Sequence, residues 1–92
     1  MNVKVKLYQP FSGIAGRKEL SMSLEIGNLG QLLENLCTDH PKMRDQIFDE
    51  EGNVMDHLNI FVNQVPVTSD KEKSMDLKDD DEVMLLVAVA GG

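Results

Sequence analysis

The sequence predicts an α+β fold in which a mixed sheet has one main helix packed across one of its faces. Short segments with a period of two lie near both ends of the chain, and this period is typical of half-buried strands. One longer segment between them has apolar residues at helical spacing. Because neither a single helix nor a sheet can bury its own apolar surface, the two must pack against each other.

Two strands are expected near the N-terminus. Residues 2–8 alternate apolar and polar side chains, and residues 20–26 do the same. The segment Pro10–Gly16 contains one proline and two glycines, which interrupt both helical and strand periods. We therefore expect a turn there, joining the two strands into a hairpin.

The main helix is predicted from Asn28 to near His40. Asn28 can cap it, and Gln31 stands three residues later in the position of a capping box. Pro41 disfavours helical geometry in the residue before it, so the helix should end there. The apolar stripe of this helix consists of Leu29, Leu32, Leu33, Leu36 and Cys37.

The rest of the chain predicts a second helical turn and the returning strands. The turn runs from Pro41 to Phe48, and strands are expected at 58–62 and 83–87. A short edge piece is expected at 65–67, because Pro66 cannot donate to a central ladder. Polar turns or connections are expected at 49–53, 68–78 and 79–81. This order of elements gives a ubiquitin-like β-grasp.

Length and composition limit the remaining possibilities. The 92 residues fit a single domain, 1–92, with an extended tail at 88–92. A net charge of -7 makes nucleic acid a poor partner and favours a basic protein. No apolar run approaches the ~20 residues of a membrane helix. One cysteine excludes an internal disulfide framework and fits a reducing cytoplasm, so we expect a cytoplasmic protein.

No catalytic or metal site is predicted from the side chains. His40 and His57 have no Glu or Cys at ligand spacing. Cys37 continues the apolar stripe of the helix and is expected to be a small buried hydrophobe. No Ser-His-Asp arrangement can be proposed on any specific ground. We therefore expect that the protein itself is not an enzyme and that it has no bound cofactor.

The strongest local signal is the glycine pair Gly91 and Gly92 at the end of the sequence. Glycine lets another backbone approach closely, and five residues beyond Val87 can extend roughly 17 Å into a narrow site. A terminal carboxylate on Gly92 is ionised at neutral pH, and it becomes a reactive electrophile only after adenylation by ATP. The alternative is an inert, frayed tail.

The last strand, 83–87, is apolar on both faces. Met84 and Leu86 point away from the face that carries its other apolar residues. We expect Tyr8 to join them, with Pro66 near the rim, and an exposed apolar patch of this kind is typical of a partner site.

The alternative for this patch is coverage by the protein itself. Either of two segments, 41–56 or 68–77, would have to lie over the face that Met84 and Leu86 share.

Six segments carry a resemblance to a known family. They are Val3-Lys4-Val5-Lys6-Leu7, Ile14-Ala15-Gly16, Leu29-Gly30-Gln31-Leu32-Leu33, Ile60-Phe61-Val62-Asn63-Gln64, Leu77-Lys78-Asp79-Asp80-Asp81-Glu82-Val83 and Val89-Ala90-Gly91-Gly92. In this order the chain resembles the ubiquitin-like sulfur carriers, which include the small subunit of molybdopterin synthase and the thiamine sulfur carrier. The resemblance covers essentially all 92 residues.

The resemblance implies a function for the tail. Gly92 would be adenylated by a ubiquitin-activating-like enzyme that uses ATP, and then converted to a thiocarboxylate. The sulfur would pass to an intermediate held by a larger synthase subunit or another acceptor enzyme, with molybdopterin biosynthesis as the first pathway. The family's hydrophobic docking positions map onto Tyr8, Pro66 and Leu86.

One departure from the family pattern keeps other functions open. The molybdopterin branch commonly has two prolines at the positions of Val87 and Ala88. Without them, a carrier for cysteine or thiamine synthesis stays open, as does an archaeal small modifier conjugated to lysines through Gly92. A third class is a β-grasp interaction module with an inert tail.

Overall fold

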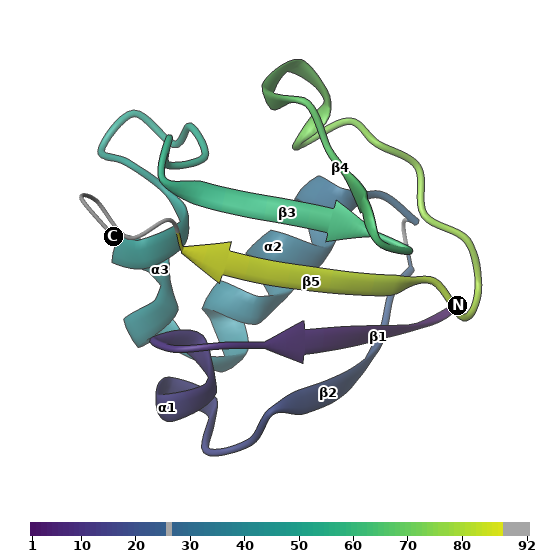
Figure 1. The fold of residues 1–92 in the computed structure, drawn as a ribbon, viewed down its shortest axis with the longest axis horizontal. Helices are drawn as coiled ribbons and strands as arrows, with labels where there is room; N and C mark the ends of the chain where they lie inside the picture. The colour runs from purple at the N-terminus through teal and green to yellow at the C-terminus, as the bar shows by residue number, and fades with distance from the viewer. Residues whose placement is uncertain (26, 88–92) are drawn as a thin grey trace.

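The computed structural model describes residues 1–25 and 27–87 (Figure 1). Within them a five-stranded sheet has the strand order β2-β1-β5-β3-β4. Its strands are β1 (Asn2–Leu7), β2 (Glu19–Ser23), β3 (Leu58–Val62), β4 (Val65–Pro66) and β5 (Glu82–Val87). β1 and β5 are parallel and the other neighbours are antiparallel, so the sheet is mixed, as predicted. Helix α2 (Leu29–Asp39) crosses behind it in Figure 1.

The predicted hairpin and edge strand are confirmed. β1 and β2 pair in antiparallel register, and β4 lies at the edge of the sheet. β2 is shorter than the predicted strand 20–26, although Leu24 still exchanges backbone hydrogen bonds with Met1. Ile26 lies outside the described residues.

The turn predicted at Pro10–Gly16 is wrong, because this segment contains the short helix α1 (Phe11–Ala15). The Phe11 side chain is completely buried in the core and anchors the segment there. Gly16, with a φ of 75°, then ends the helix in a left-handed conformation that glycine adopts without strain. A single helical turn is too short to show a helical period in the sequence.

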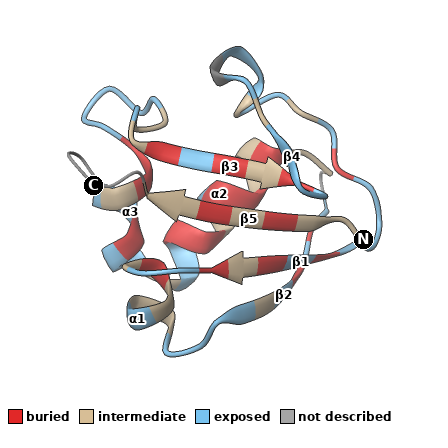
Figure 2. Cartoon of the chain, in the orientation of Figure 1, coloured by how far each residue is buried: buried red, intermediate tan, exposed pale blue. Residues whose placement is uncertain are grey.

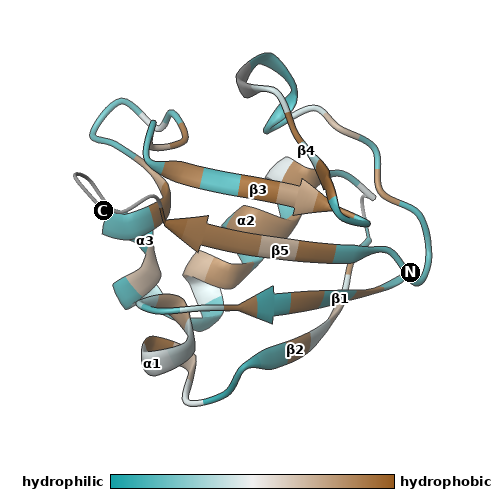
Figure 3. Cartoon of the chain, viewed as in Figure 1, coloured by the Kyte–Doolittle hydropathy of each residue, from teal (hydrophilic) through white to brown (hydrophobic). Residues whose placement is uncertain are grey.

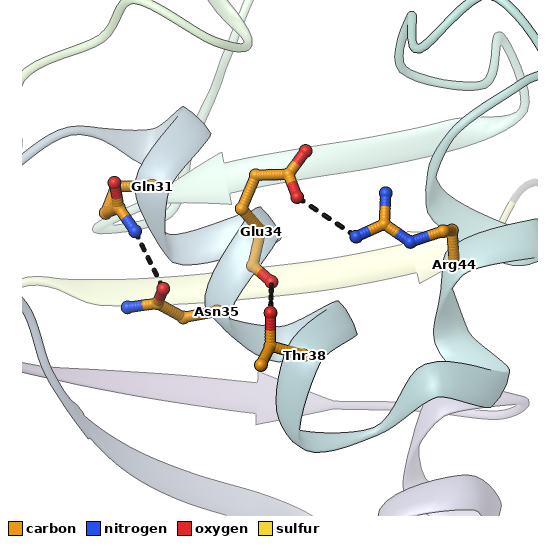
Figure 4. A network of polar contacts seen from close by, with 5 residues as sticks. All are labelled: Gln31, Glu34, Asn35, Thr38 and Arg44. Carbon is orange, nitrogen blue, oxygen red and sulfur yellow. Dashed lines mark hydrogen bonds and ion pairs between the residues drawn. The ribbon is translucent and has the colours of Figure 1, made fainter.

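The predicted start and end of α2 are confirmed. The Gln31 N–H donates to Asn28 Oδ1 at 2.8 Å. The reciprocal half of the capping box is absent from the described contacts, since the Gln31 side chain instead donates to Asn35 Oδ1 at 2.7 Å (Figure 4). His40 follows α2 with φ -132° and ψ 81°, which is not helical, as expected before Pro41.

The core lies between the sheet and α2. Figure 2 shows buried residues alternating along the strands and following one side of the helix. The buried strand residues include Val3, Val5, Leu7, Leu58, Ile60, Val62, Val83 and Leu85, and the helix adds Leu29, Leu32, Leu33, Leu36 and Cys37. The burial predicted for Cys37 is therefore confirmed.

Three short helices complete the described structure: η1 (Pro41–Met43), α3 (Arg44–Ile47) and η2 (Ser69–Lys71). The first two confirm the helical turn predicted at 41–48. They bury Met43 and Ile47 in the core beside α2.

The segment 68–77 also lies on the side of α2. The Leu29 N–H donates to the Met75 carbonyl at 2.9 Å, and the Gly30 N–H donates to the Lys73 carbonyl at 3.1 Å. Lys73 also approaches Phe48, with its Nζ 6.0 Å from the ring centre, so this segment meets the end of α3. These contacts place Lys73 and Met75 beside the start of α2.

Candidate docking face and C-terminal tail

The side chains of β5 divide between the two faces of the sheet. Val83 and Leu85 are completely buried against the α2 layer. Met84 and Leu86 point to the other face, because successive strand residues alternate, and both are half-buried. Figure 3 shows apolar colour along most of β5, so the strand is apolar on both faces, as predicted.

Cross-strand pairing builds a row of side chains around Met84. Lys6 of β1 lies on one side of Met84 and Phe61 of β3 on the other. Phe61 in turn lies opposite Pro66 of β4. Directly paired residues share one face of a sheet, so these four side chains form one row across the face that points away from α2.

A second row contains Leu86 and Tyr8. Leu7 pairs with Leu85 in the parallel ladder, and Tyr8 and Leu86 are the next residues along the chain after this pair. On its other side Leu86 pairs with Asn59 of β3. Tyr8 keeps 43% of its surface exposed, which is high for a large aromatic side chain.

The structure therefore brings the four predicted docking residues to one face, which we call the outer face. It consists of Lys6, Tyr8, Phe61, Pro66, Met84 and Leu86. Phe61 was missed by the sequence analysis, although the strand 58–62 has its other apolar residues at 58, 60 and 62. That parity places position 61 on the outer face.

Charged residues lie along one side of the outer face. Lys4 and Lys6 have the same parity on β1 as Tyr8, and Lys6 Nζ lies 3.5 Å from Glu82 Oε1. This exposed pair contributes little to stability. Glu19 lies opposite Lys6, and Glu82 lies opposite Lys4, so two acidic residues share this side of the face with the two lysines. The charges on this side of the outer face therefore balance.

The glycine pair Gly91 and Gly92 lies outside the described residues. In the sequence these glycines follow β5 within five residues of Val87. β5 is the strand that supplies Met84 and Leu86 to the outer face.

The environment of Cys37 does not favour a reactive thiol. Cys37 is buried, and burial raises the pKa of its thiol, an effect that nearby Arg44 partly opposes. A buried thiol with a raised pKa is a poor nucleophile. Within residues 1–25 and 27–87, no three His, Cys, Asp or Glu side chains are arranged to hold a metal ion. No helix in the same ranges is long and apolar enough to span a membrane.

Comparison with protein families identifies the chain. The model of the ThiS family matches residues 5–92, which is nearly the whole sequence and includes the glycine pair. The chain belongs to the ThiS family. A search of curated proteins finds no significant match.

Solved structures agree with the ThiS assignment. Small archaeal modifier protein 1 from Methanosarcina acetivorans is 31% identical, with a TM-score of 0.82, and the alignment covers 99% of this chain and 96% of that one. A putative molybdopterin converting factor, subunit 1, from Pyrococcus furiosus is also 31% identical, with a TM-score of 0.75 and coverage of 97% and 99%.

A third structure is informative for the fold alone. SAMP1 from Haloferax volcanii is 22% identical, covers both chains completely and has a TM-score of 0.86. These similarities confirm the predicted ubiquitin-like β-grasp. They place this ThiS-family chain among the ubiquitin-like sulfur carriers and modifiers.

Proposed function

We propose that this protein is a sulfur carrier whose working group is the carboxylate of Gly92. The match of the ThiS family model through Gly91 and Gly92 carries the proposal. The outer face supports it, because a carrier must be held by an activating enzyme and an acceptor enzyme, and this apolar face offers them a binding surface.

The chemistry begins with the carboxylate, which is ionised and unreactive at neutral pH. In the site of a ubiquitin-activating-like enzyme, a carboxylate oxygen attacks the α-phosphorus of ATP, and pyrophosphate leaves. A sulfide-level nucleophile then attacks the acyl carbon and displaces AMP, which leaves a thiocarboxylate. ATP belongs to the activating enzyme, and the carrier itself needs no bound cofactor.

The acceptor in this proposal is a molybdopterin precursor held by a larger synthase subunit. The similarity to a protein described as molybdopterin converting factor, subunit 1, supports this pathway. Sulfur transfer for cysteine or thiamine synthesis would use the same thiocarboxylate and differs only in the acceptor enzyme.

A second candidate function is protein modification. The similarity to a small archaeal modifier protein at 31% identity favours it. In this case a lysine amine, and not a sulfur nucleophile, would attack the activated Gly92 carbonyl and form an isopeptide bond. Both functions require the same adenylation step.

The deciding experiment has two arms. ATP–pyrophosphate exchange with the cognate activating enzyme should be abolished by deletion of Gly92 and retained by Cys37→Ala. Intact mass spectrometry of protein from its own host should show the replacement of one terminal oxygen by sulfur. Covalent adducts on lysines would favour the modifier instead. Full exchange by the truncated protein would contradict both functions.

A further inference from the structure

The edge of the sheet formed by β2 exposes backbone groups that can pair with another strand. β2 has β1 as its neighbour on one side, and no strand of the described residues lies on the other. Leu24 exchanges hydrogen bonds with Met1, and the Leu7 N–H donates to the Lys18 carbonyl at 2.8 Å. Because hydrogen-bonded and non-hydrogen-bonded pairs alternate in an antiparallel ladder, these two points fix the pattern between them.

This pattern assigns the direction of each backbone group in β2. Residues 20 and 22 occupy the hydrogen-bonded positions, as residues 18 and 24 do, so their backbone groups bond to β1. Ser21 and Ser23 lie in the non-hydrogen-bonded positions, opposite Lys4 and Asn2. Their N–H and C=O groups therefore point away from β1, toward the open edge.

A groove runs along this edge between β2 and α2. One hollow is lined by Ser21, Met22, Ser23, Asn35, Thr38 and Asp39, and a second by Ser23, Glu25, Gln31 and Asn35. The two hollows share Ser23 and Asn35, so they form one continuous groove. Its length of about 12 Å, from residue 31 to 39 of the helix, matches about four extended residues.

The wall formed by α2 is polar and already ordered. Its residues in the groove, at 31, 35, 38 and 39, fall on one helical face. The Gln31 amide donates to Asn35 Oδ1 at 2.7 Å, and the Thr38 hydroxyl donates to the Glu34 carbonyl at 3.0 Å (Figure 4). These bonds hold the side chains in place before any ligand arrives, which lowers the entropy lost on binding.

The charges of the groove select its occupant. Its charged lining residues are Glu25 at one end and Asp39 at the other. Both are acidic, so a segment with a basic residue at each end fits by charge complementarity.

We propose that the groove binds an extended segment of a partner protein, which adds to β2 as a further strand and carries Lys or Arg residues about four positions apart. Main-chain bonds to Ser21 and Ser23 supply the pairing, as in other cases of strand addition. The acidic ends fix its position.

The same charges argue against a second copy of this chain in the groove. Pairing β2 with β2 would bring the acidic groove ends of two chains together, and each chain has a net charge of -7. The proposal does not depend on activation of Gly92, because the groove lies on the edge opposite β4 and uses none of the outer-face residues.

The test uses the intact protein and the peptide Gly-Lys-Val-Thr-Val-Lys-Gly, capped at both ends. The amide NMR signals of Ser21 and Ser23 should shift as peptide is added and then saturate, with a Kd at or below about 1 mM. Hydrogen exchange of both amides with solvent should slow. Replacing both lysines by glutamates, or N-methylating the three central residues, should weaken binding roughly tenfold.

Variants of the protein complete the test. Ser21→Pro removes an N–H that β1 does not use, so the fold should survive while binding falls roughly tenfold. Ser21→Ala is the matched control and should bind as the wild type does. Asp39→Asn should weaken binding about two- to fivefold. If Ser21→Pro does not fold, the N-methylated peptide decides.

Three results would overturn the proposal. The first is no shift of the Ser21 and Ser23 amides at saturating peptide. The second is a set of shifts confined to Tyr8, Phe61 and Leu86. The third is concentration-dependent protection of the Ser21 amide without peptide, which would assign the edge to a second copy.

Discussion

Met84 of β5 lies directly opposite Phe61 of β3, on the side of the sheet that faces away from α2. Both side chains are half-buried. Through this pair, the apolar side chains of β5 and β3 on this side of the sheet form one surface. It therefore forms the centre of the outer face, with Tyr8 and Leu86 in the next row.

The first prediction concerns docking through this face. Leu86→Lys should weaken binding to the activating enzyme by about thirtyfold or more, because anchor residues commonly contribute 2 kcal/mol or more. Far-UV circular dichroism should stay native, since Leu86 points away from the core. Binding can be measured by calorimetry.

The control for Leu86→Lys is Ser74→Lys, which adds the same charge at an exposed position between Lys73 and Met75, the two residues that bond to α2. It should bind the enzyme as the wild type does. Wild-type affinity in a folded Leu86→Lys variant would show that docking uses another surface.

The second prediction separates the buried thiol from the proposed chemistry. Cys37→Ala should lower the free energy of unfolding by about 1–2 kcal/mol, because it leaves space in a filled core. Its rate of sulfur transfer should equal that of the wild type. Urea unfolding and a transfer assay measure the two quantities, and loss of transfer in a folded variant would place the chemistry on Cys37.

Much of this fold was predictable from local signals. The alternation in 2–8 and the helical spacing from Leu29 onward depend on contacts with a single buried face, so they appear directly in the sequence. α1 was missed because its formation depends on a tertiary contact, the burial of Phe11, and its five residues are too few to show a period.

The candidate site was predictable to a different degree. Tyr8, Met84 and Leu86 could be assigned to one face from the alternation of side chains along each strand, because this alternation needs no knowledge of the partner strands. Phe61 becomes part of the same surface only when the register of β3 with β5 is known. The groove beside β2 depends on strand order, which no local pattern specifies.

The third prediction tests the contact between α2 and the segment 68–77. Gly30→Ala should lower stability, although alanine normally stabilises a helix by up to about 1 kcal/mol relative to glycine. A Cβ at position 30 would lie 2.6 Å from the Lys73 carbonyl oxygen, and that oxygen accepts the Gly30 N–H at 3.1 Å. The backbone there must move to relieve the contact.

Gly13→Ala in α1 is the matched control. Its Cβ would meet Gln9 Oε1 at 2.8 Å, at the end of a flexible side chain that can turn away. Thermal unfolding should show a lower Tm for Gly30→Ala and an unchanged or higher one for Gly13→Ala. If the Tm of Gly30→Ala were also unchanged or higher, the segment 68–77 would adapt freely to α2.

The last prediction concerns Glu72, whose Oε2 is buried without a hydrogen-bond partner among the described residues. Burial raises the pKa of this carboxyl above its ordinary value of 4.5, and the nearby charge of Asp56 adds to the effect. The folded protein therefore holds this proton more tightly than the unfolded chain does. The contribution of Glu72 to the free energy of unfolding is then most favourable below pH 4.5 and falls as the pH rises through the folded-state pKa.

Glu72→Gln removes this ionisation while keeping the shape of the side chain. The variant should be more stable than the wild type at neutral pH, and the difference should shrink as the pH falls through the folded-state pKa toward 4.5. Urea unfolding across this range measures it. Glu51→Gln is the control, since it removes a charge from an exposed position in the turn after Phe48. If Glu51→Gln gave the same pH dependence as Glu72→Gln, the effect would come from the net charge of the chain and not from the buried oxygen.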